Sequence, residues 1–491
     1  MNIINFKGER LMMISREEIV KRLIEITSEN QVVTDKEVLK QSTADRFRKI
    51  EWYFGVYTQP IPAAVVYAES KEDVVNIIEF ANENGINVVP RTGASATEGG
   101  LETVIENTIV LDGSKMNKIL DINTTDMLVT CQCGVPLEVV ENQLREQGYT
   151  TGHSPQCKPI AQMGGLVATR SIGQFSTLYG GIEDMVVGLE AVFPKKGLIK
   201  IKNVPRRAAG PDIRHIVIGN EGALCYITEV TVKIFKYYPE NNKFFGYLLD
   251  DMKTGFAVLR EVMVRGYKPS VARLYDEPDA ERHFPQASKG KCVLVLMAEG
   301  PAGIVQATSE AIEDIMTTYP QSEKVDPKVI ETWFNSLCWG LDVLEKEKMR
   351  TINTKNGVTT TEVSANWSCI QQIYERCMER IPNEIPDMTY LAAHSSHSYM
   401  NGTNLYFVYR HNIDCKPEED ITKYHLPIQT IIVEETIKAG GSMCHHHGVG
   451  KHRAPWIKEE HGSAYPILEN LKKSYDPNGI MNKGTIIPII K

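Results

Sequence analysis

The sequence lacks any apolar run of the roughly 18–20 residues that a membrane-spanning helix requires. Its first residues, MNIINFKGERLMMISREE, contain no apolar stretch of the kind found in a secretory signal peptide. Basic residues are in deficit, because 54 Lys and Arg face 62 Asp and Glu and give a net charge of −8. Proteins that bind nucleic acid carry basic faces, which argues against a nucleic-acid partner. These absences predict a cytoplasmic protein without a transmembrane segment.

Several cofactor motifs are also missing. The ten cysteines form no CxxC pair, which is typical of a reducing compartment and argues against a disulfide scaffold or an iron-sulfur cluster. Cys131 and Cys133 form a CxC in which strand alternation would place both thiols on one face, with a redox pair as the alternative. Neither GxxxxGK[ST] nor GxGxxG occurs, which argues against a P-loop nucleotidase and a simple Rossmann site.

Hydrophobic periodicity predicts alternating helices and strands up to Tyr238, which indicates an α/β region that ends at the turn PENN. The predicted helices are 16–29, 71–84 and 137–147, and the predicted strands are 63–67, 86–89, 109–111, 127–132, 184–193, 198–204 and 223–235. A second, α+β region follows. Its predicted strands are 245–249, 270–274 and 291–298, with helices at 254–264, 304–319, 428–438 and 464–473. The polar stretch 322–365 shows no assignable pattern.

Three stretches in the first region are rich in glycine, a composition that lets the backbone lie close against a flat cofactor. Residues 90–100, PRTGASATEGG, follow a predicted strand, and their backbone N–H groups can converge on a diphosphate. Residues 152–184 add paired glycines and small hydroxyl side chains, and residues 219–227, GNEGALCYI, offer a third close approach. One such stretch alone would suit an ordinary Gly/Ser turn equally well. Three in one region predict a cofactor site.

The motifs TGHSP, GGLVATRS, YGGIEDMVVGLEAV, GPDIRHIVIGNEGAL, ARLYD and HHHGVGK are spread over most of the chain. Together they resemble the vanillyl-alcohol-oxidase and p-cresol-methylhydroxylase superfamily of FAD proteins, in particular its alkyldihydroxyacetonephosphate synthase branch. Over its whole length the chain is more similar still to a bacterial group of FAD-linked oxidoreductases. The resemblance implies an α+β fold with a two-part α/β FAD-binding domain (56–238). It also implies an N-terminal helical segment (1–55), an α+β cap domain on an antiparallel sheet (239–440) and a C-terminal return to the FAD domain (441–491).

The resemblance also implies a set of FAD contacts in this chain. They fall on Pro90, Arg91, Thr92, Gly93, Ala94, Ser95, Ala96, Gln156, Cys157, Ala161, Gln162, Gly164, Gly165, Thr169, Arg170, Ser171, Ile172, Glu221, Gly222 and Ile227. The first loop keeps only Gly93 of the family's three-glycine core and lacks the histidine that links FAD covalently in some members. Cys157 lies near, not at, the linking cysteine of others. We therefore expect noncovalent FAD.

Five residues are candidates for catalysis. Arg273, on a strand among apolar residues, can hold a carboxylate or phosphate by its planar fork, with a surface salt bridge as the alternative. Tyr399 matches the family's catalytic tyrosine, with structural packing as the alternative. One or two of His445, His446 and His447 are expected to reach the site as base or anion donor. The basic run that follows, 451–453, favours an anionic substrate.

A metal site is weighed against this assignment. Related 2-hydroxyacid dehydrogenases bind a divalent metal through a histidine pair and a Glu-His pair. Here Tyr406 stands at the second histidine position and His446 replaces the glutamate, so only His397 and His447 match. We predict no metal, with zinc on these two imidazoles and on His394 or His445 as the alternative.

These observations predict an FAD-dependent oxidoreductase that oxidises a CH–OH group of a small anionic hydroxy substrate, such as a 2-hydroxy acid or sugar acid. Flavin N5 would accept the hydride. No NAD motif is visible, so electrons would leave to an electron-transfer flavoprotein, a quinone or oxygen, and the family implies a homodimer. The alternative enzyme is alkyldihydroxyacetonephosphate synthase, a transferase without net oxidation. The absence of a peroxisomal signal and of an amphipathic helix for lipid delivery argues against it. A non-enzymatic electron carrier is the third reading.

Overall fold

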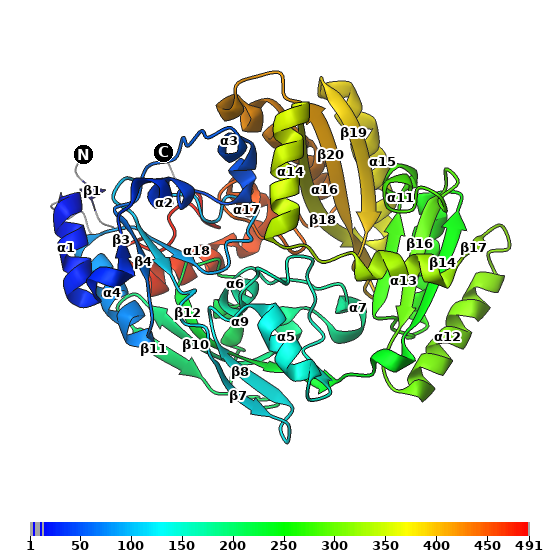
Figure 1. The fold of residues 1–491 in the computed structure, drawn as a ribbon, viewed down its shortest axis with the longest axis horizontal. Helices are drawn as coiled ribbons and strands as arrows, with labels where there is room; N and C mark the ends of the chain where they lie inside the picture. The colour runs from blue at the N-terminus through cyan, green and yellow to red at the C-terminus, as the bar shows by residue number, and fades with distance from the viewer. Residues whose placement is uncertain (1–2, 5–9, 12–13, 490–491) are drawn as a thin grey trace.

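Two sheets carry the first half of the chain in this computed structural model, which describes residues 3–4, 10–11 and 14–489 (Figure 1). The smaller sheet has the order β3-β4-β6-β5, in which β4, β6 and β5 are parallel. Its strands are β3 (Val32–Val33), β4 (Ala64–Tyr67), β5 (Val88–Arg91) and β6 (Ile109–Asp112). The larger sheet is antiparallel, in the order β11-β10-β12-β8-β7. Its strands are β7 (Ile119–Asn123), β8 (Leu128–Gln132), β10 (Val186–Phe193), β11 (Gly197–Ile201) and β12 (Tyr226–Lys233).

Helix α4 (Lys71–Asn84) shows how local signals direct the chain into the first glycine-rich loop. Ser70 and Asp73 form a capping box at its start, and Gly85 ends it with φ 65°. Ile77 and Ile78 on its inner face are buried in the core cluster that also contains Val88 of β5. The helix therefore delivers β5 into the sheet, and the loop from residue 92 onward begins where β5 ends.

Two local predictions in this half are wrong. The strand predicted over 184–193 begins at Val186, because residues 182–185 form the short helix α8 (Ile182–Met185), where the Asp184 carboxylate accepts the N–H of Gly181 at 2.9 Å. Cys131 lies in β8 but Cys133 follows it, and the two buried thiols pack into different core clusters. All ten cysteines are unbonded.

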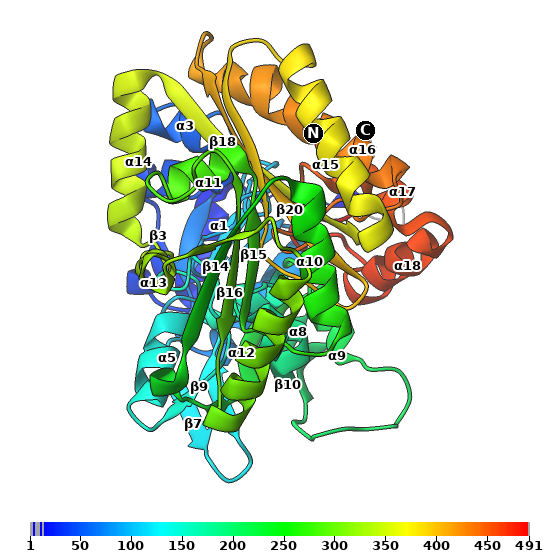
Figure 2. The same ribbon diagram turned by 90° about the vertical axis from the view of Figure 1, so that its right-hand side faces the viewer.

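The cap is a seven-stranded antiparallel sheet in the order β17-β14-β16-β15-β19-β20-β18. Its strands are β14 (Lys243–Leu249), β15 (Val271–Tyr275), β16 (Cys292–Ala298), β17 (Glu323–Val325), β18 (Asn356–Asn366), β19 (Met388–Ser395) and β20 (Gly402–Asn412). Helices cover its outer face (Figure 2): α10 (Met252–Val264), α12 (Ala302–Thr317), α15 (Trp367–Glu384) and α16 (Leu426–Lys438). The α+β class with an antiparallel cap sheet is confirmed.

The segment that showed no sequence pattern supplies part of the wall between the two halves. It contains β17, α13 (Pro327–Asn335), α14 (Leu341–Thr354) and β18. Helix α14 is fastened to the first half by Glu347, whose carboxylate pairs with Arg46 at 3.1 Å and with Lys49 at 2.6 Å.

The C-terminal segment returns to the first half. Met481 forms a parallel bridge with Val88 of β5, and the N–H of Asn482 donates to the carbonyl of Val88 at 2.8 Å. Ahead of this bridge lie α17 (Ile457–His461) and α18 (Tyr465–Tyr475). Among the described residues, none of the helices has the length and apolarity to cross a membrane.

Candidate active site

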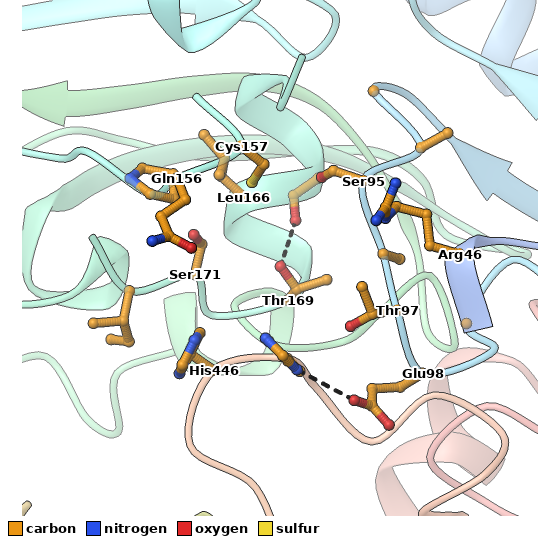
Figure 3. A pocket seen from close by; sticks show the side chains of 18 of the residues that line it. Arg46, Ser95, Thr97, Glu98, Gln156, Cys157, Leu166, Thr169, Ser171 and His446 are labelled. Atoms are coloured by element: carbon orange, nitrogen blue, oxygen red, sulfur yellow. Dashed lines mark hydrogen bonds and ion pairs between the residues drawn. The ribbon is translucent and has the colours of Figure 1, made fainter. Parts of the chain in front are cut away.

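A cavity of about 460 Å³ lies between the glycine-rich loops, the inner face of the cap sheet and the histidine loop (residues 445–447). Ligand sites commonly have volumes of roughly 300–1,000 Å³. Figure 3 shows Ser95, Gln156 and Thr169 around this space, with His446 facing Ser171. The structure places every residue with an expected FAD contact on the cavity wall except Ala161 and Arg170.

Those two residues lie behind the wall. Ala161 is fully buried, and its carbonyl accepts the N–H of Leu137 at 2.9 Å. The side chain of Arg170 is half exposed and pairs with Glu183 at 3.3 Å. Their positions favour support of the second glycine-rich stretch rather than direct contact with a cofactor.

Glycine is required at one close contact in each of the first two stretches. A Cβ on Gly93 would lie 2.3 Å from the carbonyl oxygen of Ile160, and a Cβ on Gly164 would lie 2.6 Å from the Cβ of Cys133. A side chain at Gly93 would push the two loops apart, and one at Gly164 would displace the chain after β8. The family core has further glycines that this loop lacks. Here Ala94 adopts the left-handed backbone conformation that favours glycine, with φ 51°, at a cost in strain.

The wall carries buried polar atoms that have no protein partner. Gln162 Oε1, Gln174 Oε1 and Asn220 Oδ1 have none among the described residues, although all three side chains line the cavity. A buried acceptor without a hydrogen bond is costly. A ligand that offers several donors, as the flavin and ribityl groups of FAD do, would satisfy these atoms, so the residues present fit FAD.

A single buried carboxylate fixes the histidine loop. Glu362 on β18 accepts the backbone N–H groups of His445 at 2.6 Å, His446 at 3.2 Å and His447 at 3.0 Å. Burial opposes ionisation of Glu362, but the positive charge of Arg453 outweighs it and holds the pKa of Glu362 below its usual range. The loop is therefore tied to the cap sheet through its main chain.

Arg453 joins this carboxylate to the first half of the chain. It is fully buried, and its Nη1 donates to Glu362 Oε1 at 3.2 Å while its Nη2 donates to Glu98 Oε1 at 3.1 Å. His447 Nδ1 lies 3.3 Å from the same Glu98 oxygen. Glu98 belongs to the first glycine-rich loop, so one charge network connects that loop, the cap and the histidine loop.

Tyr399, His445 and His446 form a chain of hydrogen bonds that ends at the cavity. Tyr399 Oη lies 2.7 Å from His445 Nε2, and His445 Nδ1 lies 2.9 Å from His446 Nδ1. His446 and His447 line the cavity, whereas Tyr399 and His445 lie behind them. Burial lowers the pKa of His445 to about 4 and that of His446 well below its usual value, so both rings are neutral at neutral pH.

Arg273 lies on the cap side of the cavity on β15. Its side chain is buried, with 4% exposed, and its Nη2 lies 3.1 Å from Nε2 of His394. Its Nε has no partner, and no carboxylate within the described part of the chain pairs with it. The alternative of a surface salt bridge is therefore wrong.

The three-residue basic run at 451–453 does not face the cavity as a free cationic surface. Arg453 forms ion pairs with Glu98 and Glu362, and His452 Nε2 lies 2.8 Å from Glu102. Lys451 donates to the carbonyl of Gly100 and to two side chains of the C-terminal segment, and its burial lowers its pKa to about 8. The run is structural, so it gives no support for an anionic substrate.

The histidines do not assemble as the metal alternative expected. Ring nitrogens of His397, His445 and His446 lie within 4.8 Å of one another, while His447 faces Glu98 and His394 faces Arg273. The three clustered rings already have protein partners: His397 Nδ1 lies 2.8 Å from Ser176 Oγ, and the other two belong to the chain from Tyr399. The prediction of no metal stays a prediction.

Sequence reasoning missed Glu98 and Glu362, and it named His394 only as an alternative zinc ligand. Glu98 lies inside a stretch recognised for its glycines, and its charge among neutral residues was the available signal. Glu362 lies in the unassigned stretch, between threonines and Val363, where nothing local distinguishes it from an exposed strand residue. Only the fold shows that it faces a buried arginine.

A two-part α/β region with glycine-walled loops, covered by an antiparallel cap sheet that contributes polar side chains, defines a flavoprotein with a cap over its flavin site. Family models agree: the FAD binding domain matches residues 62–201, and the C-terminal domain of FAD linked oxidases matches residues 238–486. The chain belongs to the FAD-linked oxidase family, and FAD is its cofactor.

Relatives are similar over most of the chain. The uncharacterized FAD-linked oxidoreductase YgcU of Escherichia coli K12 is 63% identical over 98% of this chain and 100% of its own length. Alkyldihydroxyacetonephosphate synthase of Dictyostelium discoideum is 26% identical over 88% of this chain and 74% of its own. Mitochondrial cytochrome D-lactate dehydrogenase 1 of Saccharomyces cerevisiae is 25% identical over 87% and 72%. A solved alkyldihydroxyacetonephosphate synthase structure shares the fold with a TM-score of 0.80, at 22% identity over 100% of this chain and 89% of that one.

Proposed function

We propose that this FAD-dependent enzyme oxidises the CH–OH carbon of a small anionic hydroxy substrate, of the 2-hydroxy acid or sugar-acid class. The observation that carries the proposal is Arg273, which is buried on the cavity wall and, among the residues that the structure describes, has a partnerless donor and no carboxylate to neutralise it. A buried guanidinium without a counter-charge is costly unless a ligand supplies one. A substrate carboxylate or phosphate fits that requirement.

The neutral imidazole of His446 can serve as the base for the substrate hydroxyl. Flavin, when bound, accepts the hydride from the carbinol carbon at N5. His446 on the cavity wall can take the hydroxyl proton at Nε2, the ring nitrogen that does not face His445. Because Glu362 Oε2 lies 3.5 Å from Nδ1 of His446, its carboxylate stabilises the imidazolium that results.

The hydrogen-bond chain offers this proton a way out of the cavity. His446 can pass its Nδ1 proton to Nδ1 of His445, and His445 can pass its Nε2 proton to Tyr399 Oη as the half-buried phenol releases its own hydroxyl proton to solvent. The carbinol thus loses one hydride and one proton and becomes a carbonyl. Tyr399 acts in this scheme as the outer member of the chain and not as a group that touches the substrate.

We further propose that electrons leave the reduced flavin to an acceptor other than NAD, with an electron-transfer flavoprotein as the candidate partner. Absence of an NAD-binding motif supports this, and the family match to FAD linked oxidases agrees with net oxidation. Alkyl transfer, as in the synthases that share the fold, is the second candidate.

Dye-coupled assays test the role of the anion. Reduction of dichlorophenolindophenol should proceed with 2-hydroxy acids or sugar acids and fail with their methyl esters. Arg273→Ala should raise the KM for the acid by roughly 10–100-fold, the loss of one charge-assisted contact, while kcat changes little. Arg265→Ala, at an exposed ion pair, is the matched control. An ester turned over as well as its acid would contradict the proposal.

A further inference from the structure

We propose that His394 and Asp279 are positioning residues, which hold Arg273 so that its free donors face the substrate anion while its positive charge stays uncompensated. The proposal rests on the proposed function, because it assumes that Arg273 binds the anion. It goes beyond it by assigning a task to two buried side chains on β19 and α11 (Glu277–His283).

Geometry fixes the tautomer of His394. A guanidinium can only donate, so Nε2 of His394, 3.1 Å from Arg273 Nη2, must be an unprotonated acceptor. The proton of the neutral ring then lies on Nδ1, which donates to Asp279 Oδ2 at 2.7 Å. All three side chains are more than nine-tenths buried. Asp279 thus selects the one tautomer that can accept from Arg273.

The surroundings keep His394 neutral and its ring in place. Burial lowers the pKa of His394 to about 4, and the charge of Arg273 adds to this effect. The ring stacks on Tyr406, with centroids 4.9 Å apart and planes inclined by 15°. Tyr406 occupies the position where related enzymes have a metal-binding histidine, so this chain uses the position to pack His394.

Because His394 is a neutral acceptor, it orients Arg273 without neutralising the guanidinium charge, as a carboxylate would. Had Asp279 bonded Arg273 directly, the pair would be neutral and could attract an anion only weakly. The imidazole inserted between them orients the guanidinium by a hydrogen bond and leaves its charge for the ligand. Arg282 instead takes up the charge of Asp279, with Nε 3.3 Å from Oδ1. Arg273 also contacts the rings of Tyr275 and Trp333, whose centroids lie 5.3 Å and 5.5 Å from its guanidinium carbon.

Three substitutions of His394 separate positioning from packing. In His394→Gln the amide can reach Arg273 with its oxygen, which restores the acceptor at the place of Nε2. In His394→Asn the shorter amide reaches Asp279 but not Arg273. His394→Phe keeps the stacked ring and removes both nitrogens. The holoenzyme of each variant is titrated with oxalate, a dianion that cannot be oxidised, by the perturbation of the flavin absorption band, and KM and kcat are measured with the acid that the wild type oxidises.

We expect His394→Gln to bind oxalate within about threefold of the wild type. His394→Asn and His394→Phe should bind it about 10-fold or more weakly, with a parallel rise in KM and little change in kcat. Equal oxalate affinity in the Gln and Asn variants, or a loss confined to kcat, would overturn the proposal. Should the Phe variant fail to retain flavin, the Gln and Asn pair still decides. A wild type that binds oxalate but oxidises no hydroxy acid would instead refute the proposed function.

Discussion

Replacing Glu362 by Gln tests whether one carboxylate holds the histidine loop. The side chain accepts from His445 and His446 through Oε2, and from His447 and Arg453 through Oε1. Gln keeps one oxygen, so its amide NH₂ must face donors at the other position. In the less costly orientation two hydrogen bonds to a charged acceptor are lost, and Arg453 keeps Glu98 as its one carboxylate partner.

The size of the effect follows from those contacts. Hydrogen bonds to charged groups contribute roughly 1.5–3 kcal/mol each, and breaking a buried ion pair costs roughly 3–5 kcal/mol. We therefore expect the free energy of local opening of residues 445–447 to fall by about 3–5 kcal/mol. Since each 1.4 kcal/mol is tenfold, amide hydrogen exchange in this loop should accelerate by roughly 100-fold or more.

Hydrogen–deuterium exchange by mass spectrometry on the holoenzyme measures this directly, in the peptide that contains the histidine loop. The matched control is Glu379→Gln, at a pair whose carboxylate is 63% exposed, where a change within about 0.5 kcal/mol is expected. Exchange in the Glu362→Gln loop within threefold of the wild type would refute the reasoning, because the three N–H bonds would then not limit opening of the loop.

Three further predictions concern the proton chain and the flavin. Tyr399→Phe should slow flavin reduction by roughly 100-fold while the spectrum of bound FAD persists, and an unchanged rate would remove Tyr399 from the chain. The rate constant of flavin reduction should be level above about pH 6 and fall on acidification below about pH 5. The sign follows because the pKa of His445, lowered to about 4, keeps the ring a neutral acceptor until that range; a rate that rises with acid would contradict it. Acid precipitation should release the flavin into the supernatant, since burial raises the pKa of Cys157 to about 11 and disfavours a reactive thiolate; flavin retained in the pellet would show a covalent link.

Much of the fold was predictable because its signals are local. Helix 71–84 is predicted by the capping residues Ser70 and Asp73 at its start and by Gly85 at its end. The structure has the same bounds. Cap strands β14, β15 and β16 are mostly apolar runs, and β16 is buried along its whole length. Helix α14 carries no such signal, since it exposes Leu341 at 72% and is held by ion pairs to residues some 300 positions earlier. No pattern within the helix could reveal those partners.

The site divides in the same way. Gly93 and Gly164 were recognisable because close backbone approach demands glycine and leaves a mark in the sequence. Roles that depend on distant partners were not. In the sequence alone, Arg453 could equally be a cation that binds substrate. Only the structure shows that Glu98 and Glu362 neutralise it. The family match assigned Tyr399 a catalytic role, but it bonds His445, which lies behind His446, so Tyr399 stands two residues behind the cavity wall.

Anaerobic titration of the purified yellow protein tests the central claim most directly. The oxidised-flavin band is followed while 2-hydroxy acids, sugar acids and acyl-dihydroxyacetone phosphate are added in turn. The account predicts that a small hydroxy or sugar acid bleaches the band and yields one carbonyl product per flavin reduced. A band that none of the acids bleaches, together with exchange of the acyl group of acyl-dihydroxyacetone phosphate for a fatty alcohol, would contradict it and identify an alkyl transferase.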